Sequence, residues 1–238
     1  MCRLYLSKGS VNLSKALKFA ARYDPYAPSE KKQHGDGWGF VAATRLSFMY
    51  YKSAAPAWDD PIPVPMWEAV LAHARAASIG EPLGAEHAHP YAVHLPNGGI
   101  IFVAHNGSVD KYSLAAEVGI DPNRHTDSYV LALYLARHWD DLEKALDNVA
   151  NLYMKTALNV VILEYPSLRA FAYSRYKGNR NYYALYILNA KYYTAVVSST
   201  LLQILGRGGR GVGARRVTDF LRRRNRRCRG YRLYIREA

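Results

Sequence analysis

Apolar and polar side chains alternate in many short segments of the chain, a pattern that is typical of β-strands. Residues 3–7 alternate as a half-buried strand does, and residues 70–76 are almost continuously apolar, as in a buried strand. Further segments with these patterns lie at 38–43, 46–52, 92–95, 99–105, 158–165, 168–174, 182–189 and 194–198. A strong turn signal at residues 96–98, Pro-Asn-Gly, predicts that the two strands flanking it pair as a hairpin.

Apolar residues that recur every three or four positions predict a helix over 12–23. Helices are also predicted over 127–138 and 141–152, the second of them capped by Asp140 or Asp141. The chain therefore runs from strands through a few central helices to strands again. This order favours an α+β fold in which antiparallel sheets carry helices on their outer faces.

The net charge of +13 is concentrated at one end of the 238-residue chain. Residues 206–238 hold twelve arginines against Asp219 and Glu237, a balance of +10 that leaves +3 for the rest. We therefore divide the chain into a domain over 1–203 and a basic, arginine-rich tail over 204–238 that is partly disordered or atypical. Within this tail, a short basic helix is predicted over 217–227 and an edge strand over 231–235.

Arginine clusters neutralise phosphates without reading a base sequence, so the tail is a candidate for binding nucleic acid or another polyanion. The alternatives are a solvated tail without a ligand and a sequence that has diverged through a shifted reading frame. Composition changes abruptly after Gln203, as either a frame change or an appended segment would produce.

The two cysteines, Cys2 and Cys228, exclude a disulfide framework and indicate a reducing compartment. No apolar segment is long enough to span a membrane, and the first residues lack the pattern of a secretion signal. No paired-cysteine metal spacing occurs. We therefore expect a cytoplasmic protein without a metal, a cofactor or a membrane partner.

Cys2 follows Met1, which cells usually remove when the next side chain is small. Removal would leave a thiol and a free α-amino group on one residue, that is, a nucleophile and its own base. An α-amine has a pKa of about 7.7–8.0 and a thiol one of about 8.5, so the amine can accept the thiol proton near neutral pH. Alternatively, Cys2 is only a small residue near a terminus.

Two further segments suit substrate binding. Residues 34–40, His-Gly-Asp-Gly-Trp-Gly-Phe, hold three glycines, which allow the backbone to approach another group closely. A glycine-rich turn that enters a hairpin is the alternative. Arg75 ends an apolar strand, where a buried guanidinium requires an anion and suits a carboxylate. A structural salt bridge is the alternative for this residue.

Asn106 and Gly107 follow an apolar strand and offer a side-chain amide and an unhindered backbone N–H. Two such donors can point at one developing oxyanion, although an Asn-Gly turn is the simpler interpretation. Asp127 stands at a predicted helix start, where it can bind an ammonium group or interact with the helix N-terminus.

In this order, with Cys2 in front, the motifs resemble the class II glutamine amidotransferase domain of the N-terminal nucleophile (Ntn) hydrolases. The resemblance extends from Cys2 to about Thr200 and is nearest to the stand-alone members. The stretches that carry it are Met-Cys-Arg-Leu at 1–4, His-Gly-Asp-Gly-Trp-Gly at 34–39 and His-Pro-Tyr at 89–91. It implies a four-layer αββα sandwich of two antiparallel sheets flanked by helices.

The resemblance also implies a mechanism. Cys2 Sγ attacks the side-chain amide carbon of glutamine, with its own α-amine as base, and Asn106 Nδ2 and the Gly107 N–H hold the oxyanion. Ammonia leaves for a partner synthase, and water hydrolyses the thioester to glutamate. The residues implied in substrate binding are Arg75 for the α-carboxylate, Asp127 for the α-ammonium, the backbone of Trp38 and Gly39, and the hydroxyl of Ser78.

The chain departs from the family pattern at two places. Tyr129 follows Thr-Asp-Ser where family members often have glutamate, and the arginine-rich ending replaces a short apolar-aromatic one. The sequence leaves two other functions open. One is hydrolysis of another γ-glutamyl amide or peptide, and the other is polyanion binding by a degenerate enzyme fold.

Overall fold

A computed structural model describes residues 2–28, 32–206, 213–217 and 232–235. The strands are β1 (Arg3–Gly9), β2 (Trp38–Ala43), β3 (Phe48–Ser53), β4 (Ala69–Ala74), β5 (Tyr91–His94), β6 (Ile100–Val109), β7 (Met154–Tyr165), β8 (Ala170–Tyr176), β9 (Leu185–Ala190), β10 (Tyr193–Ser198), β11 (Gly213–Arg216) and β12 (Arg232–Ile235). The α-helices are α1 (Ser14–Arg22), α2 (Lys111–Val118), α3 (Asp127–Arg137), α4 (Leu142–Leu152), α5 (Arg180–Tyr183) and α6 (Ser199–Gly206).

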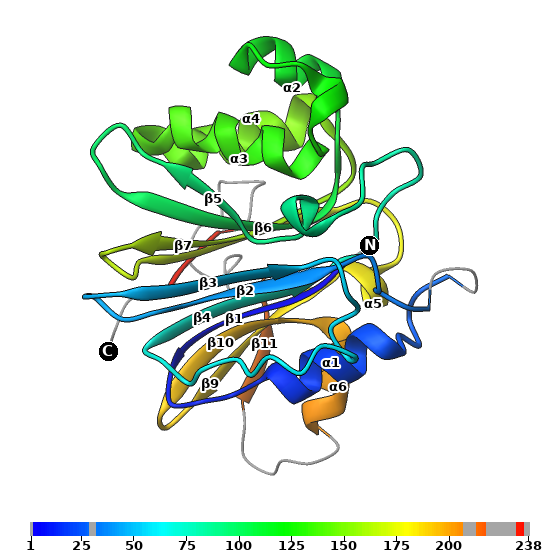
Figure 1. Ribbon diagram of the computed structural model, residues 1–238, viewed down its shortest axis with the longest axis vertical. Coiled ribbons are helices and arrows are strands. Elements are labelled where there is room, and N and C mark those ends of the chain that lie inside the picture. The colour runs from blue at the N-terminus through cyan, green and yellow to red at the C-terminus, as the bar shows by residue number, and fades with distance from the viewer. Residues whose placement is uncertain (1, 29–31, 207–212, 218–231, 236–238) are drawn as a thin grey trace.

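Two antiparallel sheets face each other in the middle of the molecule (Figure 1). The seven-stranded sheet has the order β11-β9-β10-β1-β4-β2-β3, and the five-stranded sheet has the order β12-β8-β7-β6-β5. Helices α2, α3 and α4 cover the outer face of the smaller sheet, and α1 and α6 cover the outer face of the larger one (Figure 1). The predicted α+β class and the four-layer αββα sandwich are confirmed.

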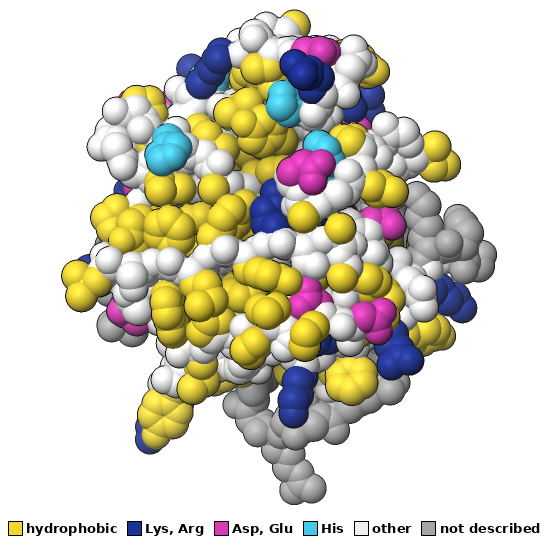
Figure 2. Space-filling view, in the orientation of Figure 1, with side chains coloured by type: hydrophobic (Ala, Val, Ile, Leu, Met, Phe, Trp, Pro, Cys, Tyr) yellow, Lys and Arg dark blue, Asp and Glu magenta, His cyan; other side chains and the backbone are white. Residues whose placement is uncertain are grey.

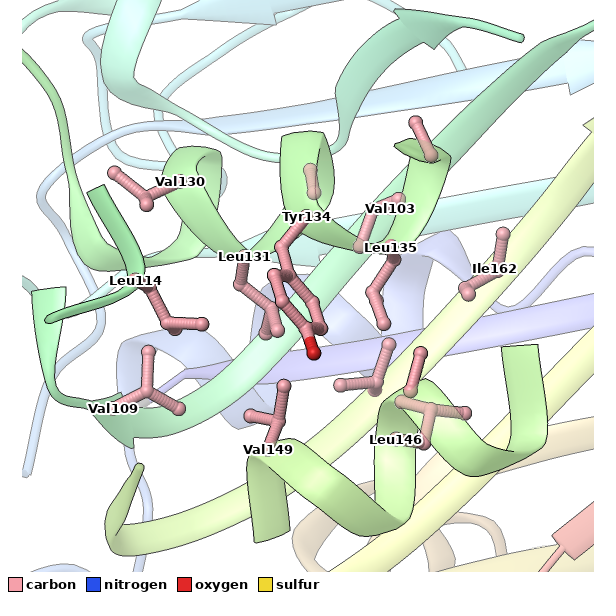
Figure 3. Close-up of a cluster of buried hydrophobic side chains, with 14 of the residues drawn as sticks. Val103, Val109, Leu114, Val130, Leu131, Tyr134, Leu135, Leu146, Val149 and Ile162 are labelled. Atoms are coloured by element: carbon pink, nitrogen blue, oxygen red, sulfur yellow. The ribbon is translucent and has the colours of Figure 1, made fainter. Parts of the chain in front are cut away.

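Three apolar layers hold the sandwich together. The layer between the sheets includes Leu4, Leu6 and Phe102, whereas Tyr5 packs in the layer beneath α1 and α6. Alternation along β1 therefore sends successive side chains to opposite faces of the sheet, as a period of two requires. Figure 3 shows the third layer, in which Leu131 and Leu135 of α3 and Val149 of α4 pack over the smaller sheet.

The structure confirms most of the predicted elements, and Asp141 caps α4 by accepting a hydrogen bond from the Lys144 N–H. The strand predicted over 182–189 is wrong at its start, because the chain first forms the short helix α5 and β9 begins only at Leu185. No element was predicted between 107 and 126, where α2 lies. This helix buries Leu114, Ala115 and Val118 but has little amphipathic pattern, so the sequence signal is weak.

The tail adds one strand to each sheet. The predicted edge strand is present as β12, which pairs with β8, and β11 pairs with β9 at the edge of the larger sheet. Helix α6 extends across position 203, the predicted end of the domain. The basic helix predicted over 217–227 lies almost entirely outside the described residues. The division at 203 and the polyanion-binding role of the tail stay predictions.

Hydrophobic side chains gather across the middle of one face of the molecule, at the edges of the two sheets (Figure 2). Phe48, Met49 and Tyr50 of the edge strand β3 are among the exposed large apolar residues. Within the part of the chain that the structure describes, no helix has the length and apolar character needed to cross a bilayer.

Candidate active site

Cys2 lies directly before β1, at the end of the sandwich where the two sheets meet the loop after β4 (Figure 1). Its side chain is only 7% exposed. The Cys2 N–H donates to Asn106 Oδ1 at 2.9 Å, which bridges the two sheets. Cys2 Sγ accepts from the Ala76 N–H at 3.4 Å and lies 3.7 Å from the Ala76 carbonyl oxygen. The thiol is therefore fixed between β1, β6 and the residue that follows Arg75.

Asn106 projects into the space between the sheets, because it shares the face of β6 that carries Phe102 and Ala104. Its Oδ1 is used by Cys2, and its Nδ2 is buried without a hydrogen-bond partner among the described residues. A buried amide donor without a partner costs about 1–3 kcal/mol, so native proteins seldom keep one without a reason. This donor belongs to the same amide group that accepts from the Cys2 N–H.

Close contacts within the sheet leave no room for a side chain at position 107. A Cβ at this position would lie 1.8 Å from the Ala157 carbonyl oxygen and 2.8 Å from His105 Nε2. Asn106 and Gly107 lie inside β6, where they pair with Asn159 and Leu158. The Asn-Gly turn considered as an alternative is therefore wrong. The pair was also expected just after the end of an apolar strand, whereas the strand continues past both residues to Val109.

Arg75 directly follows β4 and is 3% exposed. Its Nη1 donates to the Pro82 carbonyl oxygen at 2.8 Å. Its backbone bonds to Gly37 and Asp36 tie the glycine-rich segment to the site. Among the described residues, no carboxylate pairs with its guanidinium, so the structural salt bridge considered as an alternative is not found there. A buried guanidinium with donors to spare suits a carboxylate ligand.

Asp127 is the first residue of α3, and Thr126 rather than Asp127 caps this helix. Its carboxylate accepts hydrogen bonds from the Val109 N–H at 3.1 Å and from the Ser128 hydroxyl at 3.0 Å. The side chain is half-buried. Asp127 is thus anchored to the end of β6, two residues beyond Gly107.

Tyr91 lies among these groups. Burial raises its pKa, and the charges of Arg75, Asp127 and Cys2 act on the same hydroxyl. Tyr91 Oη donates to the His87 carbonyl oxygen at 2.7 Å and lies 2.7 Å from Thr126 Oγ1. Cys2 contacts Ala76, which follows Arg75, and Asn106, which lies on the strand whose Val109 contacts Asp127. These contacts bring the predicted site residues to one end of the sandwich.

The other predicted residues take different positions. The Trp38 side chain is fully buried in the layer beneath α1, where its Nε1 donates to Asp60 Oδ2 at 2.9 Å, so it does not face Cys2. A Cβ on Gly39 would lie 2.5 Å from the carbonyl oxygens of His89 and Tyr51, so this glycine permits a close approach of the backbone. Ser78 is exposed and lines a cavity of about 570 Å³.

A buried ion-pair network behind Cys2 was not predicted. Arg3 Nη1 donates to the Cys2 carbonyl oxygen at 2.9 Å, and its Nη2 forms an ion pair with Asp24. Asp24 also accepts from Thr200 Oγ1 at 2.6 Å and lies 3.0 Å from His34 Nε2. The sequence signal was available, because a charged residue at an apolar strand position needs a partner.

These contacts set two pKa values. Burial alone would raise the pKa of Asp24, but the hydrogen bond from His34, the charge of Arg3 and the hydrogen bond from Thr200 lower it to about 2. Burial lowers the pKa of His34 to about 4, against the opposing effect of Asp24. Near neutral pH the network therefore contains one cation, one carboxylate and a neutral imidazole.

Two buried histidines, His73 and His89, pack against each other with their ring planes tilted by 31°. The rings of His73 and His89 are 4.0 Å apart, and His73 Nε2 lies 3.2 Å from the His105 carbonyl oxygen. Burial holds the pKa values of both well below the usual range. Within the described part of the chain, no cluster of three or more potential metal-ligating side chains occurs.

Comparison with solved structures identifies the fold. The B. subtilis glutamine phosphoribosylpyrophosphate (PRPP) amidotransferase, complexed with ADP and GMP, matches with a TM-score of 0.61 at 16% sequence identity. The match covers 90% of this chain and 49% of that one. A glutamine aminotransferase class-II domain protein from Silicibacter pomeroyi matches with a TM-score of 0.50 at 16% identity, over 90% of this chain and 99% of that one. The chain has the fold of the class II glutamine amidotransferases. The predicted resemblance is confirmed at this level.

One curated relative adds a second comparison. The γ-glutamyl-hercynylcysteine sulfoxide hydrolase of Mycobacterium tuberculosis (strain CDC 1551 / Oshkosh) is 32% identical over 126 residues. This match covers 49% of the present amidotransferase-fold chain and 51% of the relative. The chain thus spans about half the length of the curated relative and of the B. subtilis structure. No protein-family profile matches the chain.

Proposed function

We propose that the chain hydrolyses the side-chain amide of glutamine to glutamate and ammonia through a thioester on Cys2. After removal of Met1, the Cys2 α-amine takes the thiol proton, directly or through a water, and Sγ attacks the amide carbon. Asn106 Nδ2 and the Gly107 N–H stabilise the oxyanion that develops. The proton passes to the leaving nitrogen, ammonia departs, and water hydrolyses the thioester.

In this proposal, Arg75 and Asp127 bind the two charged groups of the substrate's amino-acid end. Arg75 pairs with the α-carboxylate, and Asp127 pairs with the α-ammonium. Because both groups lie at a fixed distance from Cys2, they place the γ-carbonyl carbon within reach of the thiol. The Ser78 hydroxyl and the backbone of Trp38 and Gly39 are secondary contacts. Support comes from the burial of Arg75 beside Ala76, whose backbone contacts Cys2 Sγ.

The proposal rests mainly on the hydrogen bonding of the Asn106 side chain. One end of its amide orients the Cys2 nitrogen at 2.9 Å, and the other end is a buried donor that no described residue uses. A merely structural asparagine would bond both ends. An oxyanion hole instead needs a preorganised donor aimed at charge that appears only during the reaction.

A second candidate is hydrolysis of another γ-glutamyl amide by the same residues. The curated relative, a γ-glutamyl-hercynylcysteine sulfoxide hydrolase, favours this alternative. Neither Arg75 nor Asp127 discriminates between the two, because both contact only the head of the γ-glutamyl group. If glutamine is the substrate, a partner synthase receives the ammonia. A polyanion-binding protein with a degenerate active site remains the alternative of a different class.

The test measures glutamate release from glutamine by purified chain that begins at Cys2, without any partner. The wild-type chain is expected to release glutamate, and Cys2→Ala is expected to release none above the uncatalysed background. Cys228→Ala is the matched control and should retain wild-type activity. Activity that survives in Cys2→Ala, with an unchanged circular dichroism spectrum, would contradict the proposed nucleophile.

A further inference from the structure

Arg3, the residue after Cys2, carries a charge but is fully buried. Its ion-pair partner Asp24 and the neighbouring His34 are fully buried as well, and Thr200 is 1% exposed. Taking two charges out of water is costly, and their mutual attraction often fails to recover that cost, so a buried ion pair is weak evidence for a contribution to stability. The pair therefore calls for an explanation other than the stability of the fold.

Asp24 holds this network together with both of its carboxylate oxygens. Oδ2 pairs with the Arg3 guanidinium and lies 3.0 Å from His34 Nε2. Oδ1 accepts from Thr200 Oγ1 at 2.6 Å and from the Tyr26 N–H at 3.0 Å. These partners come from β1, from the connection between α1 and β2, and from α6. Three separate parts of the chain thus fix the carboxylate, and the carboxylate in turn fixes the guanidinium.

The other side of the Arg3 guanidinium faces the backbone of Cys2. Its Nη1 donates to the Cys2 carbonyl oxygen at 2.9 Å and to the Tyr182 carbonyl oxygen at 3.2 Å. The guanidinium carbon also lies 4.6 Å from the centre of the Tyr182 ring. Tyr182 belongs to α5, which lies beside the start of β1 (Figure 1). The network therefore ends on the residue that carries the thiol.

Cys2 needs such support because the β-ladder does not reach it. The pairing of β1 with β4 begins at Arg3, and the first residues of a chain are poorly ordered unless contacts tie them down. Three contacts do so here. Asn106 Oδ1 accepts from the Cys2 N–H, the Ala76 N–H donates to Cys2 Sγ, and Arg3 Nη1 donates to the Cys2 carbonyl oxygen. Of these three, only the last is held in place by a buried ion pair.

We propose that Arg3 and Asp24 are positioning residues for Cys2. Arg3 acts on the Cys2 carbonyl group, and Asp24 acts through Arg3. This inference rests on the proposed function and concerns the support of the same site. With the carbonyl group held, the α-amine and the thiol of Cys2 keep one orientation towards the amide carbon of the substrate. An error of about 1 Å in such a geometry can lower a rate by about 100-fold.

The experiment removes both charges at once in Arg3→Met/Asp24→Asn, so that no buried ion is left unpaired. Asparagine still offers an acceptor to Thr200. The readouts are glutamate release from glutamine, the urea unfolding midpoint, and intact mass to show that the chain begins at Cys2. We expect a folded chain whose kcat is lower than wild type by about 10- to 100-fold, as the loss of one hydrogen bond from a charged donor provides. KM should change little, because Arg75 and Asp127 are untouched.

A second variant covers the case in which the double variant does not fold. Arg3→Lys keeps a cation beside Asp24 but lacks the planar fork that serves Asp24 and the Cys2 carbonyl group together. Its kcat should also fall while KM changes little. A structural salt bridge would instead be restored by lysine, and kcat of the folded chain would stay at the wild-type value.

Arg169→Met is the matched control. Arg169 forms an ion pair with Glu164, which lies opposite Ile101 on β6. Ile101 precedes Asn106 by five residues, roughly 16–17 Å along a strand, so this pair is remote from Cys2. The control should keep the wild-type kcat and KM.

Wild-type kcat in the folded double variant, or in Arg3→Lys if the double variant does not fold, would overturn this inference and leave the proposed function intact. An equal fall of kcat in Arg169→Met would overturn it too, because the loss of any arginine ion pair would then suffice. A wild-type chain that begins at Cys2 and releases no glutamate would overturn the proposed function itself, and this inference with it.

Discussion

The two ends of the Asn106 side-chain amide have different surroundings. Its Oδ1 accepts from the Cys2 N–H, and its Nδ2 stays a buried donor next to the thiol. Because the side chain comes from β6 and Cys2 precedes β1, this contact joins the two sheets at the candidate site. The strand backbone around it is paired with β7, so the position of the donor is fixed by the sheet.

Removing this donor gives the first prediction at the residue scale. Asn106→Ala should lower kcat on the proposed substrate by about 100- to 1,000-fold, the usual effect of losing one oxyanion donor. KM should change much less, because Arg75 and Asp127 still hold the head group. Asn123→Ala, which changes an exposed asparagine, is the control and should have wild-type kinetics. Steady-state kinetics of both variants provide the measurement, and an unchanged kcat in Asn106→Ala would exclude the oxyanion role.

The sequence pointed to the candidate site residues more readily than to the buried groups that pack behind them. Cys2, Asn106 and Arg75 belong to short motifs that can be recognised locally. The network around Arg3 cannot, because Asp24 and Thr200, which hydrogen-bond to each other, are 176 positions apart and meet only in the folded chain. Trp38 belongs to a motif, but its side chain packs on the other face of the sheet.

At the element scale, β6 connects the core to the site. Its first half packs Phe102 and Ala104 between the sheets, and its second half carries Asn106 and Gly107. The register shifts between Gly107 and Val109, where the strand approaches Asp127. Periodicity predicted the first half, whose residues are apolar. The extension was missed because residues 106–108, Asn-Gly-Ser, form a run without an apolar side chain, which shows neither alternation nor an apolar segment.

Gly107→Ala tests this geometry. An added Cβ would lie 1.8 Å from the Ala157 carbonyl oxygen, so β6 or β7 must shift. Overpacking of this kind usually costs about 1–3 kcal/mol of unfolding free energy. Gly206→Ala is the control, because a Cβ there meets no atom within 4 Å. Urea unfolding of both variants provides the measurement, and equal midpoints would show that the backbone contact is unimportant.

His34, in the connection between α1 and β2, should make the free energy of unfolding depend on pH. The unfolded chain protonates His34 near its ordinary pKa of about 6.5, whereas in the folded chain burial lowers this pKa to about 4. The contribution to unfolding free energy is therefore complete above pH 6.5 and is lost as the pH falls towards about 4. One such group changes the slope by up to about 1.4 kcal/mol per pH unit.

His34→Gln should reduce the slope of unfolding free energy against pH by the contribution of one proton, up to about 1.4 kcal/mol per pH unit. Buried His73 and His89, whose pKa values are also lowered, keep part of the dependence in the variant. His94→Gln changes an exposed histidine and should retain the full wild-type slope. Unfolding free energies at several pH values between 4 and 7 supply the comparison. A wild-type slope in His34→Gln would mean that this imidazole is not held neutral in the folded chain.

At the scale of the whole molecule, the site exists only because two sheets face each other. The larger sheet places Cys2 and Arg75, and the smaller sheet and its covering helix place Asn106, Gly107 and Asp127. Strand periodicity predicts each sheet's elements but carries no information on which strands pair across long loops. The four-layer arrangement followed from the motifs, and the structure confirms it.

The tail extends both sheets of this arrangement. β11 extends the larger sheet beside β9, and β12 extends the smaller sheet beside β8. The edge strand over 231–235 was predicted, whereas β11, with the sequence Gly-Ala-Arg-Arg, has no alternation by which it could be recognised. The backbone pairing shows that two of its segments belong to the same sheets as the rest of the fold.

We propose that Cys2, freed of Met1, is the nucleophile of a glutamyl-binding site. The most direct test is intact-mass measurement of the purified chain before and after treatment with a diazo-ketone analogue of norleucine, followed by peptide mapping. We expect a chain that begins at Cys2 and gains one adduct on that residue. An active enzyme that retains Met1, or one whose adduct lies on Cys228 instead, would contradict the account.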